Sequence, residues 1–296
     1  MKKFSIILIL IAMISCKEKQ QKERLIKSTF KNSEFIEIKD FQVCLPISYY
    51  EEPEKQYPVL YQMDCQNLFV DSSAYGGISW RYDSVADSLV LANQINEFII
   101  VGINHAGIKR FSEYMPQKVV KAIPDEHKDS LIKRVEFPVY SDNFLKFLVN
   151  ELKAEIDNTY RTLPDKENTY VGGSSMGGLI SMYALCEYPE IFNAAICMST
   201  HWIVSLDNST PEIAMEIQRY FANNLPKNKK IYFDHGTEGL DQFYELYQKI
   251  ADSVLIESGY RINENFLSKK FVGHDHNEYY WNKRLDVPLK FMFGTN

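Results

Sequence analysis

Residues 169–184 read TYVGGSSMGGLISMYA, and this stretch decides the fold. The first three residues are β-formers and the residues from Leu179 onward read as a helix, so the glycines and serines form the turn between them. Residues 173–177 fit the pattern G-x-S-x-G, in which a sharp strand-to-helix turn strains a serine backbone and exposes its hydroxyl. On its own the pattern also fits an ordinary glycine-rich turn, so Ser175 is a candidate nucleophile whose partners must be sought elsewhere.

Composition indicates one globular domain and argues against some partners. The chain has 296 residues, of which 45% are hydrophobic and 24% charged, which is enough to bury one large core. Its formal net charge is -6. Because acidic and basic residues are interleaved, with no basic cluster beyond the N-terminus, we expect no nucleic-acid partner.

The N-terminus differs in kind from the rest of the chain. Lys2 and Lys3 precede an apolar run at residues 4–14, which is typical of a signal peptide and too short for an ordinary membrane span. Residues 13–16 (MISC) resemble a bacterial lipobox, in which Cys16 is lipidated. We therefore expect a signal peptide at 1–15, a lipidated tether at 16–30, and an exported protein anchored to a membrane of the cell envelope. A secreted protein cut near the same point is the alternative.

Strand and helix patterns alternate through the rest of the chain. Expected strands lie at 35–38, 41–45, 59–63, 98–103, 169–172, 194–198, 230–234 and 266–272. Expected helices lie at 142–158, 176–187, 211–223, 241–257 and 278–290. This order predicts an α/β domain over 31–296, with a mostly parallel sheet and helices on both faces. Residues 106–140 show no clear period and are expected to form loops or a cap over the carboxyl ends of the strands, where such sheets place their sites.

Candidate partners for Ser175 follow it in the order that this architecture requires, acid and then histidine. The loop after the strand at 230–234 contains Asp241 and a rival acid, Glu238. The loop before the last helix contains His276. His274 next to it suggests a His-x-His metal site, but no third ligand of matching spacing is nearby, so we expect neither metal nor cofactor.

Several further motifs lie in order along the chain. They are residues 59–69 (VLYQMDCQNLF), 110–116 (RFSEYMP), 172–178 (GGSSMGG), 236–241 (GTEGLD) and 276–278 (HNE), with Trp281 and Arg284. Together they resemble the Putative esterase family of α/β hydrolases, which includes siderophore esterases, feruloyl and acetyl xylan esterases and S-formylglutathione hydrolase. The resemblance implies an α/β-hydrolase fold with Ser175 as nucleophile, His276 as general base and Asp241 as acid. It also implies an oxyanion hole formed by the N–H groups of Met176 and Gln66.

The walls of the substrate pocket are less clear from the sequence. Arg110, Glu113 and Tyr114 are expected at the pocket mouth, although a solvated charged loop is the alternative. Trp202 follows the strand at 194–198 and either shapes the pocket or packs in the core.

The sequence is consistent with two functions. The first is a serine carboxylic ester hydrolase acting on acylated carbohydrate, phenolic-acid or siderophore esters. The second is a non-catalytic binding or scaffolding domain, and its one hint is Cys65, which stands where the family usually has glycine. A disulfide between Cys44 and Cys65 also stays open, because both lie at the ends of expected neighbouring strands.

Overall fold

The computed structural model describes residues 23–127 and 138–295. The expected signal peptide, Cys16 and residues 128–137 lie outside the described residues. Within the described parts of the chain, no helix combines the length and the apolar character needed to cross a bilayer.

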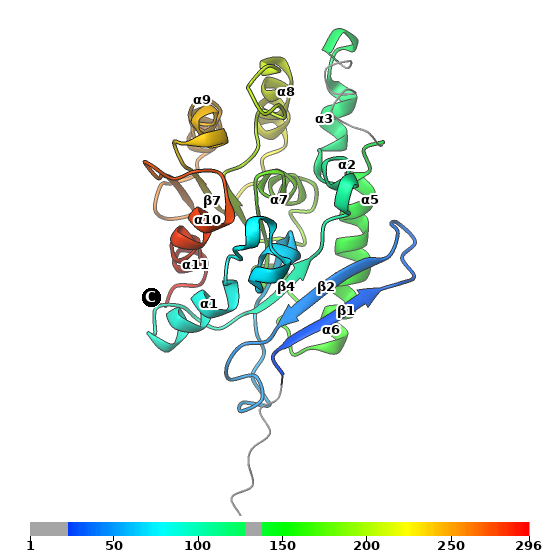
Figure 1. The fold of residues 1–296 in the computed structure, drawn as a ribbon, viewed down its shortest axis with the longest axis vertical. Helices are drawn as coiled ribbons and strands as arrows, with labels where there is room; N and C mark the ends of the chain where they lie inside the picture. Colours follow the sequence, from blue (N-terminus) through cyan, green and yellow to red (C-terminus); the bar gives the residue numbers. More distant parts are fainter. Residues whose placement is uncertain (1–22, 128–137, 296) are drawn as a thin grey trace, which may run out of the picture.

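An eight-stranded sheet forms the centre of the fold (Figure 1). Its strands are β1 (Leu25–Phe30), β2 (Lys39–Cys44), β3 (Val59–Met63), β4 (Ile99–Ile103), β5 (Thr169–Ser174), β6 (Ala194–Met198), β7 (Lys230–His235) and β8 (Phe266–Lys270). They lie in the order β1-β2-β4-β3-β5-β6-β7-β8. The pairings of β2 with β1 and β4 are antiparallel and the rest are parallel. The sheet is therefore mostly parallel, as the sequence predicted.

Helices cover both faces of this sheet. They are α1 (Tyr82–Leu91), α2 (Arg110–Tyr114), α3 (Gln117–Ala122), α5 (Ser141–Lys146), α6 (Lys153–Thr159), α7 (Met176–Glu187), α8 (Pro211–Asn224), α9 (Glu245–Glu257), α10 (Glu278–Arg284) and α11 (Asp286–Phe293). A π-helical segment, η5 (Phe147–Leu152), joins α5 to α6.

The sheet separates two hydrophobic clusters because successive strand side chains point to opposite faces. On β3, Leu60 belongs to the cluster under α1 and α11, which lie side by side in Figure 1. Its neighbours Val59 and Tyr61 belong to the larger cluster under α7.

The structure corrects three boundaries. No strand forms at 35–38, where the Ser33 hydroxyl accepts hydrogen bonds from two following N–H groups in a turn. Instead β1 occupies residues expected in the tether, so the domain begins before residue 31. The expected helix at 278–290 is two helices, because Pro288 has no N–H and its ring would clash with the carbonyl of Arg284 in a continuous helix.

Loops at the carboxyl ends of β3, β5, β6, β7 and β8 place the candidate residues together. They include two short 3₁₀ helices, η1 (Cys65–Asn67) and η7 (Gly239–Phe243), and a third, η4 (Gly107–Lys109), follows β4. Carboxyl ends of parallel strands meet at one edge of a sheet, so side chains from distant parts of the sequence converge there.

Candidate active site

Ser175 occupies a strained turn between β5 and α7. Its backbone angles are φ 56° and ψ -125°, a left-handed conformation that a residue with a side chain rarely adopts. A Cβ atom on Gly173 would lie 2.4 Å from the Gly177 carbonyl carbon, so the turn can close only with glycine at residue 173. This geometry is the strand-turn-helix that the G-x-S-x-G pattern predicted.

A continuous chain of hydrogen bonds connects Ser175 with a histidine and a buried acid. His276 Nε2 lies 2.9 Å from Ser175 Oγ, and His276 Nδ1 lies 2.6 Å from Asp241 Oδ1. The Asp241 side chain is fully buried, whereas 12% of the His276 side chain is exposed. Glu238 is exposed, and its carboxylate accepts a hydrogen bond from Thr237. The structure therefore places Asp241, and not Glu238, next to the histidine.

The second oxygen of Asp241 is held by donors from other elements. Oδ2 accepts hydrogen bonds from Ser199 Oγ and the Gly236 N–H, both at 2.6 Å, and lies 3.6 Å from Arg284 Nη2. Burial acts to raise the pKa of Asp241, but the hydrogen bonds from His276, Ser199 and Gly236 bring it below its usual value. The carboxylate is thus fixed in position and kept ionised.

Arg284 ties this acid to the core of the sheet. Only 1% of the residue is exposed, and its Nη2 atom donates to Ser199 Oγ at 2.6 Å and lies 3.1 Å from Asp234 Oδ1 at the end of β7. Burial raises the pKa of Asp234, and the Arg284 charge acts against that rise. Trp281 Nε1, from the same helix as Arg284, also donates to Ser199 Oγ at 3.0 Å.

The two expected oxyanion donors lie in the first turns of two helices. Met176 is the first residue of α7, and Gln66 is the second residue of η1, positions where N–H groups have no partner within the helix. Their role stays a prediction. The positive φ in this second turn falls on Asp64, at 61°, and not on Cys65.

Cys65, where the resemblance led us to expect glycine, is the first residue of η1. Its side chain is buried against Gly102 of β4, where an added Cβ atom would lie 2.6 Å from Cys65 Sγ. Because Gly102 has no side chain, β4 leaves room for the Cys65 sulfur. Cys44 and Cys65 are free thiols, so the disulfide left open by the sequence is not formed.

A cavity of about 460 Å³ opens beside Ser175. Its wall combines apolar and polar residues, which include Tyr75, Phe111, Leu206, Leu240, Trp281, Asn67, His105, Arg110, His201 and Glu278. Arg110 was expected here, and it binds both oxygens of Asp64, at 2.7 and 2.8 Å.

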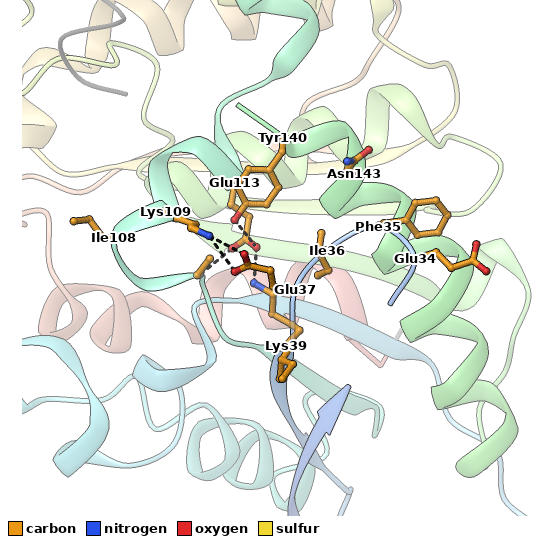
Figure 2. A pocket seen from close by; sticks show the side chains of 12 residues that line it. Glu34, Phe35, Ile36, Glu37, Lys39, Ile108, Lys109, Glu113, Tyr140 and Asn143 are labelled. Carbon is orange, nitrogen blue, oxygen red and sulfur yellow. Dashed lines mark hydrogen bonds and ion pairs between the residues drawn. The ribbon is translucent and has the colours of Figure 1, made fainter. Parts of the chain in front are cut away.

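Three other expected pocket residues lie elsewhere. Glu113 lines a separate hollow of about 630 Å³, where it pairs with Lys39 and accepts a hydrogen bond from Tyr140 (Figure 2). Tyr114 is fully buried, and Trp202 is 1% exposed with its Nε1 donating to Gln248 at 3.1 Å. Arg110, the first residue of the five-residue helix α2, lines the cavity, whereas Glu113 and Tyr114 of the same helix do not.

Glu278 and His201 are cavity residues for which the sequence suggested no role. Glu278 is 7% exposed, and its Oε1 accepts a hydrogen bond from Asn67 Nδ2 at 3.1 Å. Burial raises the pKa of Glu278 to about 7, and the nearby Asp64 charge adds to the rise. The one available signal was position, because Glu278 lies two residues after His276.

Among the residues that the structure describes, no group of three His, Cys, Asp or Glu side chains is arranged to hold a metal ion. The pair His274 and Asp275 lies near the site, but the His274 ring packs at a tilt against two aromatic rings, with centroid distances of 5.3 Å to Phe271 and 4.9 Å to Tyr280.

Comparisons with known proteins show the family and the fold of this chain. Residues 37–292 match the family described as Putative esterase. The ferri-bacillibactin esterase BesA of Bacillus subtilis (strain 168) is 25% identical over 222 residues, which cover 71% of each chain. A ferulic acid esterase structure has a TM-score of 0.65 at 18% identity, covering 91% of this chain and 97% of that one. S-Formylglutathione hydrolase from Agrobacterium tumefaciens has a TM-score of 0.61 at 15% identity, covering 90% and 94%. The chain belongs to the Putative esterase family, and it is a carboxylic ester hydrolase with the α/β-hydrolase fold.

Proposed function

We propose that Ser175, His276 and Asp241 are the catalytic triad of this esterase. The observation that carries the proposal is the unbroken chain from Ser175 Oγ through both nitrogens of His276 to a buried carboxylate. The strained backbone of Ser175 supports it, because such strain persists where the surrounding structure enforces it for function.

Acylation follows from these contacts. Ser175 Oγ attacks the ester carbonyl while its proton moves to His276 Nε2, and Asp241 stabilises the resulting imidazolium through Nδ1–H. The N–H groups of Met176 and Gln66 then hold the negative oxygen of the tetrahedral intermediate. When the bond to the leaving alcohol breaks, the proton on Nε2 passes to its oxygen.

Deacylation repeats these steps with water. His276 takes a proton from the water molecule as it attacks the acyl carbonyl, and returns it to Ser175 Oγ when the acyl bond to serine breaks. The proposed steps use only residues of the chain and water.

The cavity suits an ester that carries both apolar and hydrogen-bonding groups. Tyr75 and Leu206 are 79% and 64% exposed at its wall, and the Arg110–Asp64 pair with Glu278 adds polar groups. We infer that the substrate is a phenolic-acid, siderophore or acylated carbohydrate ester. The first two classes are in keeping with the similarity to a ferulic acid esterase and to the ferri-bacillibactin esterase.

An esterase panel tests both parts of this proposal. The purified protein would be assayed for hydrolysis of short-chain p-nitrophenyl, feruloyl, catecholate and acetylated-sugar esters, with the Ser175→Ala protein as the control. Because serine and histidine act as a unit, Ser175→Ala and His276→Ala should each remove most activity, and the double variant should be little worse than either. Additive losses, or a Ser175→Ala protein that stays active, would contradict the triad.

We also propose export and lipidation at Cys16, on the basis of Lys2, Lys3, the apolar run and the MISC sequence. The Cys16→Ser protein should move from the membrane fraction to the soluble fraction on cell fractionation. Unchanged membrane binding in that variant would rule out lipidation at Cys16 as the anchor.

A further inference from the structure

A two-point ion pair joins the segment after β4 to the turn after β3. Arg110 Nε lies 2.7 Å from Asp64 Oδ1, and Arg110 Nη2 lies 2.8 Å from Asp64 Oδ2. Two parallel bonds of this kind fix the orientation of the carboxylate as well as its position. Only 6% of the Asp64 side chain and 27% of the Arg110 side chain is exposed, so salt and water screen the pair weakly. The pair therefore connects two parts of the cavity wall firmly.

Asp64 is the residue on which the shape of the turn depends. At φ 61° and ψ 48° its backbone is left-handed, and η1 begins at the next residue. A residue with a side chain keeps such angles only where its surroundings enforce them. A change in these angles would pull the Asp64 carboxylate away from Arg110 and break both hydrogen bonds. Arg110 thus stabilises the strained start of η1.

The same carboxylate also contacts the turn that carries Ser175. A Cβ atom on Gly177 would lie 2.9 Å from Asp64 Oδ2, so the carboxylate occupies the space that a side chain at residue 177 would need. Gly177 directly follows Met176, and Gln66 lies two residues after Asp64. The segments that carry the two expected oxyanion donors therefore meet at one carboxylate, and Arg110 holds that carboxylate.

Other contacts keep η1 folded independently of Arg110. The Asn67 N–H donates to the Asp64 carbonyl at 2.9 Å, and Ser73 Oγ donates to the Gln66 carbonyl at 2.8 Å. Loss of the guanidinium should therefore displace the Gln66 N–H without unfolding the turn.

We propose that Arg110 is a positioning residue, which holds the Asp64 turn so that the N–H groups of Gln66 and Met176 face the same oxyanion. This inference rests on the proposed function, namely attack by Ser175 and the two expected donors. The role requires no contact between Arg110 and the substrate. Its effect falls on the transition state, because negative charge develops on the carbonyl oxygen only during attack.

Steady-state kinetics of Arg110→Met with a p-nitrophenyl ester test this role. Methionine keeps an unbranched side chain and removes the guanidinium. Because loss of one oxyanion donor lowers kcat by about 10² to 10³, we expect a kcat about 100-fold lower, with KM within about twofold of wild type. The matched control is Lys109→Met. It removes a charge from the preceding residue, whose Nζ lies 3.0 Å from both carboxylate oxygens of the exposed Glu37, and should leave kcat unchanged.

A thionoester of the same acid and alcohol separates the oxyanion donors from other causes. Sulfur replaces the carbonyl oxygen in this substrate, and sulfur is a weak hydrogen-bond acceptor, so the donors contribute little to its reaction. Arg110→Met should lower kcat/KM about 100-fold for the oxygen ester and less than about threefold for the thionoester. The ratio of the two values does not depend on the concentration of folded enzyme, so partial unfolding of the variant cannot produce this result.

A second variant keeps the test decisive if Arg110→Met does not fold. Arg110→Lys retains the positive charge beside Asp64, but an ammonium group cannot bind both oxygens in the fixed geometry of a guanidinium. It should reduce the preference for the oxygen ester over the thionoester about tenfold. A wild-type preference in Arg110→Lys would then contradict the positioning role.

The outcomes separate this inference from the triad. Equal losses for the two esters would overturn the inference, because they show that Arg110 does not act through the oxyanion donors. A raised KM at unchanged kcat would overturn it as well, since it indicates a direct contact with the substrate. If Ser175→Ala is inactive and Arg110→Met matches wild type with both esters, the triad stands and Arg110 does not position the donors. If Ser175→Ala remains active, the proposed function fails first.

Discussion

Replacing Asp241 with asparagine turns one of its two acceptor oxygens into an NH2 donor, and the surrounding groups decide which one. Oδ2 accepts from the Gly236 N–H at 2.6 Å and lies 3.6 Å from the Arg284 guanidinium. Neither group can accept a hydrogen bond, so an NH2 at this position would set donors against each other in a buried place. The amide oxygen of the variant should therefore remain at the Oδ2 position, and its NH2 should face His276.

An NH2 facing His276 reverses the polarity of the chain. Nδ1 lies 2.6 Å from the acid and would have to accept a hydrogen bond, which moves the ring proton to Nε2. A histidine in this tautomer cannot take the Ser175 proton. We expect kcat to fall by about 10³ to 10⁴, or about 4 to 5.5 kcal/mol of transition-state stabilisation, with the fold retained.

The assay is steady-state hydrolysis of a p-nitrophenyl ester, with circular dichroism to check the fold. Glu238→Gln is the matched control, because Glu238 lies in the same loop with an exposed carboxylate that is not bonded to His276. It should keep wild-type activity. An Asp241→Asn protein with more than about a tenth of the wild-type kcat would refute the tautomer argument, and a crippled Glu238→Gln protein would transfer the role to Glu238.

Two further predictions concern stability. The folded protein holds the proton of Glu278 up to a pKa of about 7, above the ordinary 4.5, so this group's contribution to the free energy of unfolding is fully present below about pH 4.5 and is lost as the pH rises through about 7. Between pH 5 and pH 8 this loss lowers the free energy of unfolding of the wild type by at most about 3 kcal/mol, and Glu278→Gln should remove most of it. Urea unfolding at the two pH values measures the difference. An equal decrease in the variant and the wild type would contradict the prediction. Arg284→Met leaves Asp234 buried without its partner and should lower the free energy of unfolding by about 3 to 5 kcal/mol, whereas Lys283→Met, at the exposed neighbouring position, should change it little. A loss no larger than that of Lys283→Met would show that Asp234 does not need this charge.

The mostly parallel sheet and the turn at Ser175 could be predicted because they depend on local pattern and on the succession of elements along the chain. The glycine spacing fixes the turn whatever surrounds it, and the order of serine, acid and histidine follows from the succession of strands. The first strand could not be predicted in the same way. It lies at the sheet edge with three of its six residues exposed, so its sequence, LIKSTF, lacks a clear apolar alternation.

The cavity wall was harder to predict than the hydrogen-bond chain behind it. Arg110 and Glu113 lie on one short helix, yet only the first reaches the cavity, and a five-residue helix has no period from which its inner face can be identified. Tyr244 and His201 meet across two loops that lie 43 positions apart in sequence. Contacts of this kind depend on the packing of the whole sheet edge and leave no local pattern.

The conformation of Ser175 has a consequence for attempts to evolve this protein in the laboratory. At φ 56° and ψ -125° a serine is strained by about 1 to 3 kcal/mol, whereas glycine adopts such angles without penalty. A library screened for thermal resistance alone would therefore enrich Ser175→Gly and deliver robust proteins without the hydroxyl. A useful screen has to couple survival at high temperature to turnover, because at this one position the two goals favour different residues.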